Sequence, residues 1–337
     1  MNERRVLVTG ACGEIGQALI LDLAGKGGHR IVTADLMPLP ESLHGLPEEH
    51  LQGDLLLLTR LLYDYQFDII FHLAASLSSR AETAPEAAHR INVEGTLQLL
   101  QLAAYKSEKS GKAVMFIFPS SIAVYGLPGA ASKKRAGRVE EEQFNDPRTM
   151  YGCNKLYCEK LGMYFSNFMG QRHLDPEPPV MLDFRALRFP GLISAFTLPT
   201  GGTTDYGPEM LHRAAEGRPY ACFVDKDTAL PFMAMPDAVK SMLLLAESPK
   251  NRLSRQVYNV NAFSMTAGDF RARALKAFPD ASITFETNNR RQGIVDSWPA
   301  DVEDARARSD WGWQPDYDEE KFFEGYFLTE IKRRYRK

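Results

Sequence analysis

The feature that most constrains this fold is the segment GACGEIG at residues 10–16, with glycines at 10, 13 and 16. It follows an apolar, β-branched run, RVLVT, that predicts a buried strand. It precedes QALILDLAGKG, whose apolar spacing predicts a helix that ends at the glycines. Glycines at such a junction let the backbone approach a phosphate closely, and the helix N-terminus offers N–H groups. The order strand, glycine loop, helix therefore predicts a dinucleotide-binding unit.

The first half of the 337-residue chain continues this alternation of strands and helices. Strands are predicted in RIVTADL, LQGDL, DIIFHLAA and AVMFIFPSS, with helices around residues 56–65 and 84–104. The alternation predicts an α/β protein with a Rossmann-type, doubly wound, mostly parallel sheet. We expect a dinucleotide-binding domain over residues 1–190. A smaller C-terminal substrate lobe is expected over 191–337, with some segments returning to the first domain.

The second predicted strand ends in Asp35, about twenty residues beyond the glycine loop, where a carboxylate accepts hydrogen bonds from an adenosine ribose. Asp35 also repels a 2′-phosphate, as does Glu14, so we predict NAD rather than NADP. Ligands of such sheets bind at the carboxyl ends of the strands. The residues expected to line the cofactor site are Gly10, Gly13, Glu14, Ile15, Gly16, Asp35, Asp54, Leu55, Leu73, Ala74, Ala75, Asn92, Tyr151, Lys155 and Pro190.

Composition removes several classes of function. The net charge of −3 gives no electrostatic reason to expect nucleic acid or an anionic membrane. No apolar run approaches the ~18 residues that span a bilayer. None of the four cysteines forms a C-x-x-C pair, which predicts reduced thiols and a cytoplasmic setting. The seven histidines are scattered, so no metal site is predicted.

A candidate catalytic pair lies in YGCNK, where Tyr151 and Lys155 share one helix face. A free tyrosine has a pKa near ~10, and a nearby ammonium or a positive nicotinamide ring favours the phenolate. Lowering that pKa by ~3 units requires ~4 kcal/mol of differential stabilisation. A serine hydroxyl at the end of the strand AVMFIFPSS could hold a substrate oxygen beside the tyrosine.

Together, TGACGEIG, HLAA, PSSIAVYG and YGCNK resemble the extended short-chain dehydrogenase/reductase superfamily. The resemblance implies that Tyr151 is the general acid/base and that Lys155 binds the nicotinamide ribose. It selects Ser121 over Ser120, because Ser121 lies five residues before the glycine of VYG. It also implies a homodimer that pairs the helices at 84–105 and 151–168.

Two enzyme classes compete within this superfamily. Nucleotide-sugar epimerases and dehydratases need cations for a diphosphate, and the chain has none between Arg188 and Arg213. Such cations would have to come from elsewhere, for example Arg213, Arg218, Arg290 or Arg291. A protein that binds NAD without catalysis is a remote third interpretation, because the candidate serine, tyrosine and lysine are all present.

The blocks LRFPGLIS, GGTTDYG, LPFMAMPDAV and DSWPADVEDARARSDWGW look like those of the short-chain-type L-threonine 3-dehydrogenase family. This resemblance implies NAD-dependent oxidation of the threonine β-hydroxyl to 2-amino-3-oxobutanoate, without a metal. Hydroxyls and N–H groups of the GGTTD loop suit the carboxylate of a small zwitterion, and Asp205 or a backbone carbonyl suits its ammonium. The substrate residues expected are Ser78, Ser79, Ser121, Tyr151, Gly202, Thr203, Thr204, Asp205 and Trp298.

Three features of the sequence each have two possible interpretations. Trp298 is either a lid aromatic over the substrate or a packing residue. Residues 127–147 and 171–180 look like insertions, and we expect both to be surface loops. Either insertion could instead reshape the mouth of the site and alter the choice of substrate.

Overall fold

The computed structural model describes residues 3–169, 182–199 and 201–335. The predicted insertion at 171–180 lies outside these residues. The chain divides into two compact units, each built from three stretches. Unit 1 comprises Met1–Ser120, Asn154–Leu187 and Val239–Tyr258, and unit 2 comprises Ser121–Cys153, Arg188–Ala238 and Asn259–Lys337.

Unit 1 is built on a seven-stranded sheet with the order β11-β7-β5-β4-β1-β2-β3. Its strands are β1 (Arg4–Thr9), β2 (His29–Asp35), β3 (Glu49–Gln52), β4 (Ile69–His72), β5 (Met115–Ser121), β7 (Asp183–Phe189) and β11 (Val257–Asn259). The pairs β1–β2, β1–β4, β2–β3 and β4–β5 are parallel. The strand order reverses between β1 and β4, which is where doubly wound sheets bind ligands. The predicted α/β fold is confirmed.

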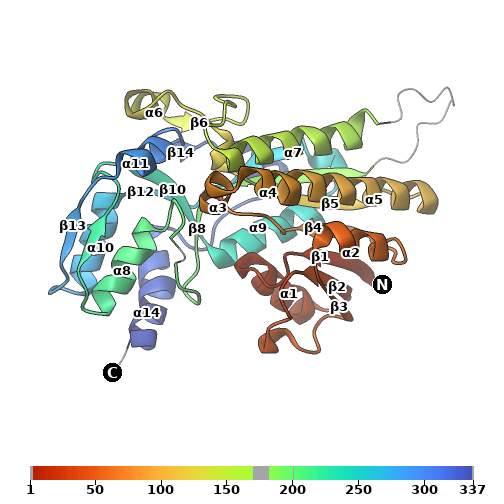
Figure 1. Ribbon diagram of the computed structural model, residues 1–337, viewed down its shortest axis with the longest axis horizontal. Helices are drawn as coiled ribbons and strands as arrows, with labels where there is room; N and C mark the ends of the chain where they lie inside the picture. Colours follow the sequence, from red (N-terminus) through yellow and green to blue (C-terminus); the bar gives the residue numbers. More distant parts are fainter. Residues whose placement is uncertain (1–2, 170–181, 200, 336–337) are drawn as a thin grey trace. The chain divides into compact units, whose positions relative to one another are not determined.

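Helices cover both faces of this sheet (Figure 1). They are α1 (Glu14–Lys26), α2 (Leu55–Leu62), α3 (Ser78–Thr83), α4 (Pro85–His89), η2 (Arg90–Glu94), α5 (Gly95–Ser110), α7 (Met150–Asn167) and α9 (Met235–Glu247), with the short turns η1 (Glu41–Leu43) and η4 (Lys250–Arg252). Figure 1 shows α2, α5 and α7 on one face. On the other face, α1 and α9 are linked by Lys26 and Glu247, 3.8 Å apart.

The core of unit 1 forms where apolar faces of the helices meet the strands. Leu7, Leu99, Phe116 and Phe184 are fully buried there, and each such side chain contributes roughly 1.5–3 kcal/mol of burial energy. Gly162 lets α7 pack closely on β7, since a Cβ at this position would lie 2.1 Å from the Phe184 ring. This close packing fixes the helix that carries the candidate catalytic pair.

The long helix expected at 84–104 is a continuous helical run over residues 85–110 that contains a π-turn. Pro85 opens α4, and α5 follows after the π-turn η2. A π-turn inserts an extra residue into helical backbone, and such turns recur at functional sites. Here the turn carries Asn92, which is buried.

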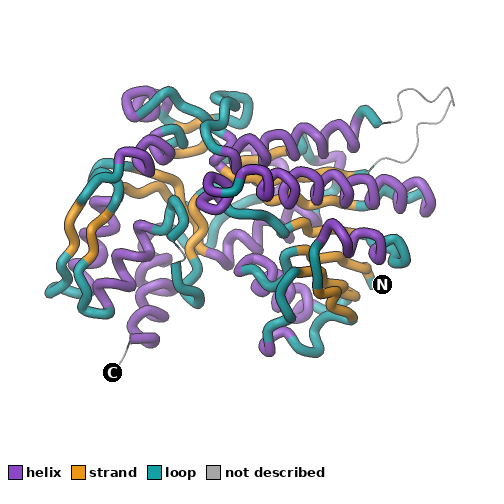
Figure 2. The backbone as a smooth tube through the Cα atoms, in the orientation of Figure 1, coloured by secondary structure: helices purple, strands orange, loops and turns teal. Residues whose placement is uncertain are grey.

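Unit 2 is a mixed lobe with small sheets (Figure 2). One sheet has the order β12-β10-β8, and the pairs β13-β9 and β14-β6 stand apart. Its strands are β6 (Arg138–Val139), β8 (Gly191–Ile193), β9 (Tyr220–Cys222), β10 (Ala229–Ala234), β12 (Phe263–Thr266), β13 (Ile283–Phe285) and β14 (Asp301–Val302). Its helices are η3 (Ile122–Val124), α6 (Ala130–Ala136), α8 (Tyr206–Ala215), α10 (Ala267–Ala277), α11 (Asn289–Asp296), α12 (Ala305–Trp311), α13 (Glu319–Lys321), η5 (Phe322–Phe327) and α14 (Leu328–Tyr335).

Aromatic side chains form the core of unit 2. The Phe232 and Phe270 ring centroids lie 5.0 Å apart at 76°, an edge-to-face contact, and Tyr206 packs edge-on against both rings. Tyr206 opens α8 directly after the GGTTD loop, so this core anchors the end of that loop.

The segment 127–147 is not the simple surface loop that its composition predicts. It forms α6 and β6, and β6 pairs in parallel with β14. Lys133 is buried, and its Nζ donates to the Val295 carbonyl at 2.9 Å. The charged sequence misleads because a lysine stem covers apolar surface while its ammonium reaches a backbone acceptor.

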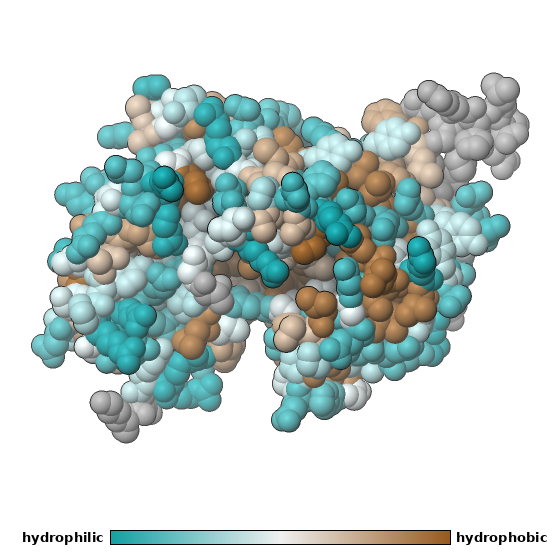
Figure 3. All heavy atoms as spheres, in the orientation of Figure 1, coloured by the Kyte–Doolittle hydropathy of each residue, from teal (hydrophilic) through white to brown (hydrophobic). Residues whose placement is uncertain are grey.

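One surface of unit 1 is unusually apolar. Figure 3 shows hydrophobic side chains gathered over α2, where Leu57 and Leu61 are 70% and 50% exposed. Within the described residues, no helix combines the length and the apolar character needed to cross a membrane.

Candidate active site

The loop after β1 fits a dinucleotide phosphate because two of its positions, 10 and 16, have room only for glycine. Gly10 has φ +69°, and a Cβ there would lie 2.5 Å from the Ala74 nitrogen. A Cβ at Gly16 would lie 2.3 Å from the Gly10 carbonyl oxygen. The backbone after β4, which contains Leu73, Ala74 and Ala75, therefore packs directly on the glycine loop. Helix α1 begins beside it, and no side chain caps its N-terminus.

Asp35 stands at the end of β2 and is held beside the same loop. Its Oδ2 accepts from the Cys12 N–H at 2.9 Å, and its Oδ1 accepts from the Met37 N–H at 2.9 Å. A carboxylate has further lone pairs, so both oxygens can still accept from hydroxyls. This donor and acceptor set fits the ribose diol of NAD. Asp54, by contrast, caps α2, because its Oδ1 accepts from the Leu56 N–H at 3.0 Å.

A buried hydrogen-bond chain, absent from the sequence prediction, connects the strand ends of unit 1. The Thr9 hydroxyl contacts His72 Nδ1 at 2.8 Å, and His72 Nε2 contacts the Thr96 hydroxyl at 3.0 Å. Thr96 donates to the Asn92 carbonyl at 2.5 Å, so we assign the proton of His72 to Nε2. Asn92 holds the backbone of Ser76 through N–H and carbonyl contacts of 2.7 and 3.1 Å.

This chain explains why Asn92 is buried at a π-turn. The amide of Asn92 fixes the segment that leads from Ala75 to Ser78 and Ser79. Ser78 is half-buried and Ser79 is exposed at the start of α3. Burial, together with a smaller effect of the nearby Lys155 charge, lowers the pKa of His72 to about 3. The imidazole therefore acts as a neutral bridge.

Tyr151 lies in the first turn of α7, and glycine fixes how that turn packs. A Cβ at Gly152 would lie 2.0 Å from the Ala123 carbonyl oxygen. The turn that carries Tyr151 is thus pressed against the segment immediately after Ser121. Burial raises the pKa of the Tyr151 phenol above its ordinary value. Burial therefore acts against the fall in the Tyr151 pKa that we expect from a nearby ammonium and a nicotinamide ring.

Lys155, one helical turn after Tyr151, reaches the end of β5. Its Nζ donates to the Pro119 carbonyl at 2.6 Å and lies 4.5 Å from the centre of the Phe118 ring. Burial lowers the pKa of Lys155 to about 8, against the attraction of Cys158 and Glu159. Glu159 is itself buried. Burial therefore disfavours the Lys155 ammonium, while the Glu159 carboxylate, one turn further along α7, favours it.

The two serines at the end of β5 have different surroundings. The Ser120 hydroxyl is buried and donates to Glu159 Oε1 at 2.5 Å. The Ser121 hydroxyl is half-buried, and its oxygen accepts from the Ala123 N–H at 3.1 Å. Among the described residues, the Ser121 hydroxyl donates to none, so its proton is available to a substrate oxygen.

The GGTTD loop of unit 2 is held from two sides. Asp205 Oδ2 accepts from the Gly202 N–H at 2.8 Å. Arg291 Nη2 donates to the carbonyls of Gly201 and Gly202 at 3.3 and 3.0 Å. Arg291, one of the four arginines named above as cations from elsewhere in the sequence, thus contacts this loop. Arg291 comes from α11, and the loop's own stretch of sequence gives no sign of it.

The remaining predicted substrate residues lie in unit 2. Thr203 is buried and Thr204 is half-buried. Pro190, which we expect at the cofactor rather than the substrate, is buried between β7 and β8. The Trp298 ring is only 3% exposed, which suits packing, while its Nε1–H has no hydrogen-bond acceptor among the described residues.

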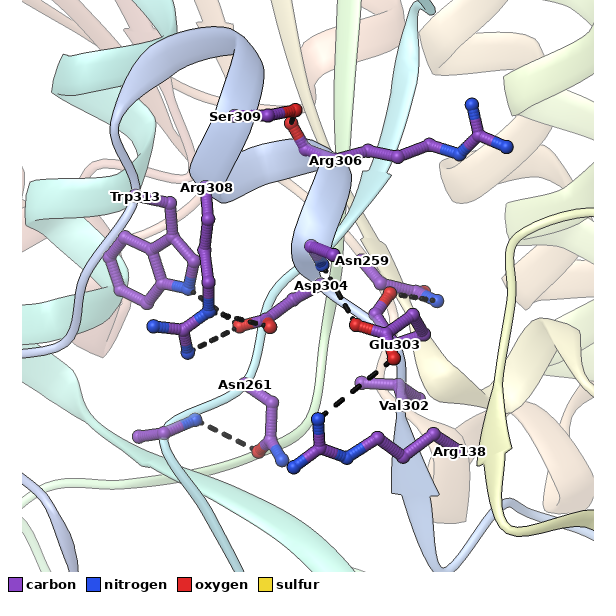
Figure 4. Close-up of polar contacts among 12 residues, drawn as sticks. Arg138, Asn259, Asn261, Val302, Glu303, Asp304, Arg306, Arg308, Ser309 and Trp313 are labelled. Carbon is purple, nitrogen blue, oxygen red and sulfur yellow. Dashed lines mark hydrogen bonds and ion pairs between the residues drawn. The ribbon is translucent and has the colours of Figure 1, made fainter.

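The block around DVEDARARSDWGW is largely structural (Figure 4). Asp304 accepts from Arg308 Nε and Nη2 at 2.8 and 2.9 Å, and from Trp313 Nε1 at 3.2 Å. Nearby, Asn259 donates to the Val139 carbonyl at 3.0 Å. It also accepts from the Tyr125 hydroxyl at 2.7 Å. These contacts tie the segment that follows Ser121 to the rest of unit 2. Among the described residues, no group of acidic, histidine or cysteine side chains could hold a metal ion.

Known proteins resemble this chain over most of its length. The mitochondrial L-threonine 3-dehydrogenase of Bos taurus is 32% identical over 321 residues, which cover 94% of this chain and 80% of that protein. The solved structure of a monomeric L-threonine 3-dehydrogenase from a metagenome has a TM-score of 0.83 and 32% identity. It covers 98% of this chain and 100% of its own. A UDP-glucose 4-epimerase of Thermotoga maritima has a TM-score of 0.79 at 20% identity, a likeness of fold alone.

The resemblance to threonine dehydrogenases of the extended short-chain type is confirmed by these relatives, and with it the expectation of an NAD-dependent enzyme. A model described as "NAD dependent epimerase/dehydratase family" matches residues 6–261. The chain belongs to this family.

Proposed function

We propose that this protein oxidises the β-hydroxyl of L-threonine to 2-amino-3-oxobutanoate with NAD. The observation that carries the proposal is similarity over nearly the whole chain to L-threonine 3-dehydrogenases. The chain also has Ser121, Tyr151 and Lys155 in the geometry described above. Bound NAD supplies the acceptor for the hydride. The glycine loop at 10–16 and Asp35 would hold this cofactor.

The chain's own groups handle the proton of the reaction. Tyr151 Oη takes the hydroxyl proton of the substrate, and the Ser121 hydroxyl donates a hydrogen bond to the same oxygen. Burial opposes the phenolate of Tyr151, so a positive charge must favour it. The Lys155 ammonium, one turn along α7, supplies such a charge, and Glu159 keeps that lysine protonated.

The loop at 201–205 suits a small zwitterion. Backbone N–H groups and the Thr203 and Thr204 hydroxyls suit a carboxylate, and the Asp205 carboxylate or a backbone carbonyl suits an ammonium. A nucleotide-sugar reaction is the alternative. Its diphosphate needs cations, but Arg213 and Arg218 are 3.2 and 3.7 Å from Glu216 and Arg291 donates to the loop. This favours the amino acid.

The test is NADH formation at 340 nm with L-threonine, L-serine, 3-hydroxynorvaline and UDP-sugars. We expect turnover of L-threonine, and Tyr151→Phe should reduce kcat by at least about 100-fold while NAD still binds. Tyr63→Phe, at an exposed tyrosine outside α5 and α7, is the matched control. Turnover of a UDP-sugar without turnover of L-threonine would refute the proposal.

We also propose a homodimer and a cytoplasmic setting. The four cysteines are free, as expected for reduced thiols. On α5 and α7, Tyr105, Tyr157 and Tyr164 expose 41%, 54% and 51% of their surface, which offers an aromatic face for pairing. Light scattering at micromolar concentration should give the mass of two chains, and the mass of one chain would contradict the dimer.

A further inference from the structure

We propose that Arg291 is a positioning residue of the substrate loop, residues 201–205. Its guanidinium fixes the peptide planes of Gly201 and Gly202 by binding their carbonyl oxygens. This inference rests on the proposed function, because it assigns the loop to substrate. Arg291 lies in the first turn of α11, and its Nη2 donates to both glycine carbonyls. The two contacts span 90 and 89 residues of sequence, so they are tertiary contacts and not local turn geometry.

Arg291 is preorganised for this role. Its guanidinium carbon lies 3.1 Å from the centre of the Phe223 ring, a stacked cation–π contact. The backbone of the same phenylalanine anchors the helix, because its carbonyl accepts from the Asn288 N–H at 2.8 Å. Asn288 then caps α11 by accepting from the Arg290 and Arg291 N–H groups. The base of the side chain and its guanidinium are thus both held against Phe223.

The contact determines which way the loop presents its donors. A trans peptide directs its C=O and N–H to opposite sides. With the Gly202 carbonyl aimed at Arg291, the N–H of Thr203 must point to the opposite side of the loop. Asp205 holds the preceding peptide by accepting the Gly202 N–H. The Gly202 carbonyl also accepts from the Asp205 N–H at 3.2 Å, so Arg291 and Asp205 together set the orientation of two consecutive peptides.

The chemistry of the contact makes arginine specific here. A guanidinium is planar and stacks on an aromatic face while its N–H fork contacts two acceptors. A lysine keeps the charge and loses both the stacking and the fork. Arg291 also faces Glu209, whose carboxylate accepts from the Tyr220 hydroxyl at 2.5 Å, so the charge is balanced locally. The guanidinium supports the backbone and does not itself need to touch substrate.

The variant Arg291→Lys tests this, with the neighbouring exposed Arg290→Lys as the matched control. We expect Arg291→Lys to raise the KM for L-threonine about tenfold, the effect of one lost charge-assisted hydrogen bond. The kcat and the KM for NAD should change less than about twofold, since catalytic and cofactor residues are untouched. Arg290→Lys should leave all three constants unchanged. An unchanged threonine KM in Arg291→Lys, or a fall in kcat alone, overturns the inference.

A second measurement does not depend on the substrate. Amide hydrogen exchange of residues 201–206 should speed up in Arg291→Lys and not in Arg290→Lys, at an unchanged melting temperature. If L-threonine is not turned over by the unmodified enzyme, the proposed function fails, but the exchange result still tests the loop contact. Equal exchange in all three proteins overturns the positioning role whatever the substrate is.

Discussion

His72 gives a quantitative prediction for stability in acid. Its side chain is buried, with both ring nitrogens in contact with threonine hydroxyls. The pKa of His72 is lowered from 6.5 to about 3, first by burial and then by Lys155. The other groups that shape its surroundings are the Thr9 and Thr96 hydroxyls, which are neutral. As pH falls, the unfolded chain binds a proton near pH 6.5 and the folded chain does not until about pH 3.

The pH dependence of the free energy of unfolding follows from the difference in protons bound by the folded and unfolded states. Above pH 6.5 both states are neutral at this position, so it has no effect there. Between pH 6.5 and 3 the unfolded state binds more protons, and the free energy of unfolding falls by about 1.4 kcal/mol per pH unit. From pH 7 to pH 5 the loss assigned to His72 is therefore about 2 kcal/mol. That is a large share of the 5–15 kcal/mol that stabilises a typical domain.

Urea unfolding at pH 7 and pH 5 measures this loss. We compare the unmodified protein, His72→Gln, and His89→Gln, an exposed-histidine control. His212, whose pKa is lowered to about 4, is present in all three and cancels from the comparison. His72→Gln should lose about 2 kcal/mol less between the two pH values than the other two proteins. Equal losses in all three would show that His72 does not stay neutral in the folded state.

Two further predictions concern the active site. Glu159→Gln removes a carboxylate that raises the pKa of Lys155, so this pKa should fall below about 8. The alkaline limb of the pH profile of kcat/KM should then move to lower pH. An unmoved limb would show that Lys155 is not the group whose titration causes this limb. Asp35→Ser removes the carboxylate that the Cys12 and Met37 N–H groups hold. The ratio of kcat/KM with NAD to that with NADP should fall at least about tenfold, and an unchanged ratio would remove Asp35 from cofactor selection.

The sheet and the glycine loop could be predicted because their signals are local. RVLVT, GACGEIG and Asp35 lie within one stretch of about thirty residues, and each residue type follows from the backbone or charge required at its place. The register Thr9–Ala34 and Thr9–His72 then brings three strand ends together, as parallel pairing requires. The π-turn around Asn92 could not be predicted from the sequence. The Asn92 side chain binds the backbone of Ser76, a tertiary contact, and the extra residue of a π-turn leaves no mark on the periodicity of apolar residues.

The buried Lys133 shows a second limit. Its neighbours in sequence, KKRAGR, are charged, and solvent exposure is the natural prediction for such a run. One member of the run is buried because its ammonium meets the Val295 carbonyl, 162 residues away. Burial of a single charge within a charged run is decided by a tertiary acceptor, and no local pattern encodes it.

The GGTTD loop has a cation beside it that is distant in sequence. The chain has no cation between Arg188 and Arg213, yet Arg291 of α11 contacts the loop. A cation can stabilise a loop by binding its carbonyls or serve a ligand by binding its phosphates. In this structure Nη2 of Arg291 donates to two carbonyls while its face covers Phe223. The positive charge is thus used to orient peptide groups, which favours recognition of a small carboxylate by the loop's N–H groups and hydroxyls over recognition of a diphosphate by the arginine itself.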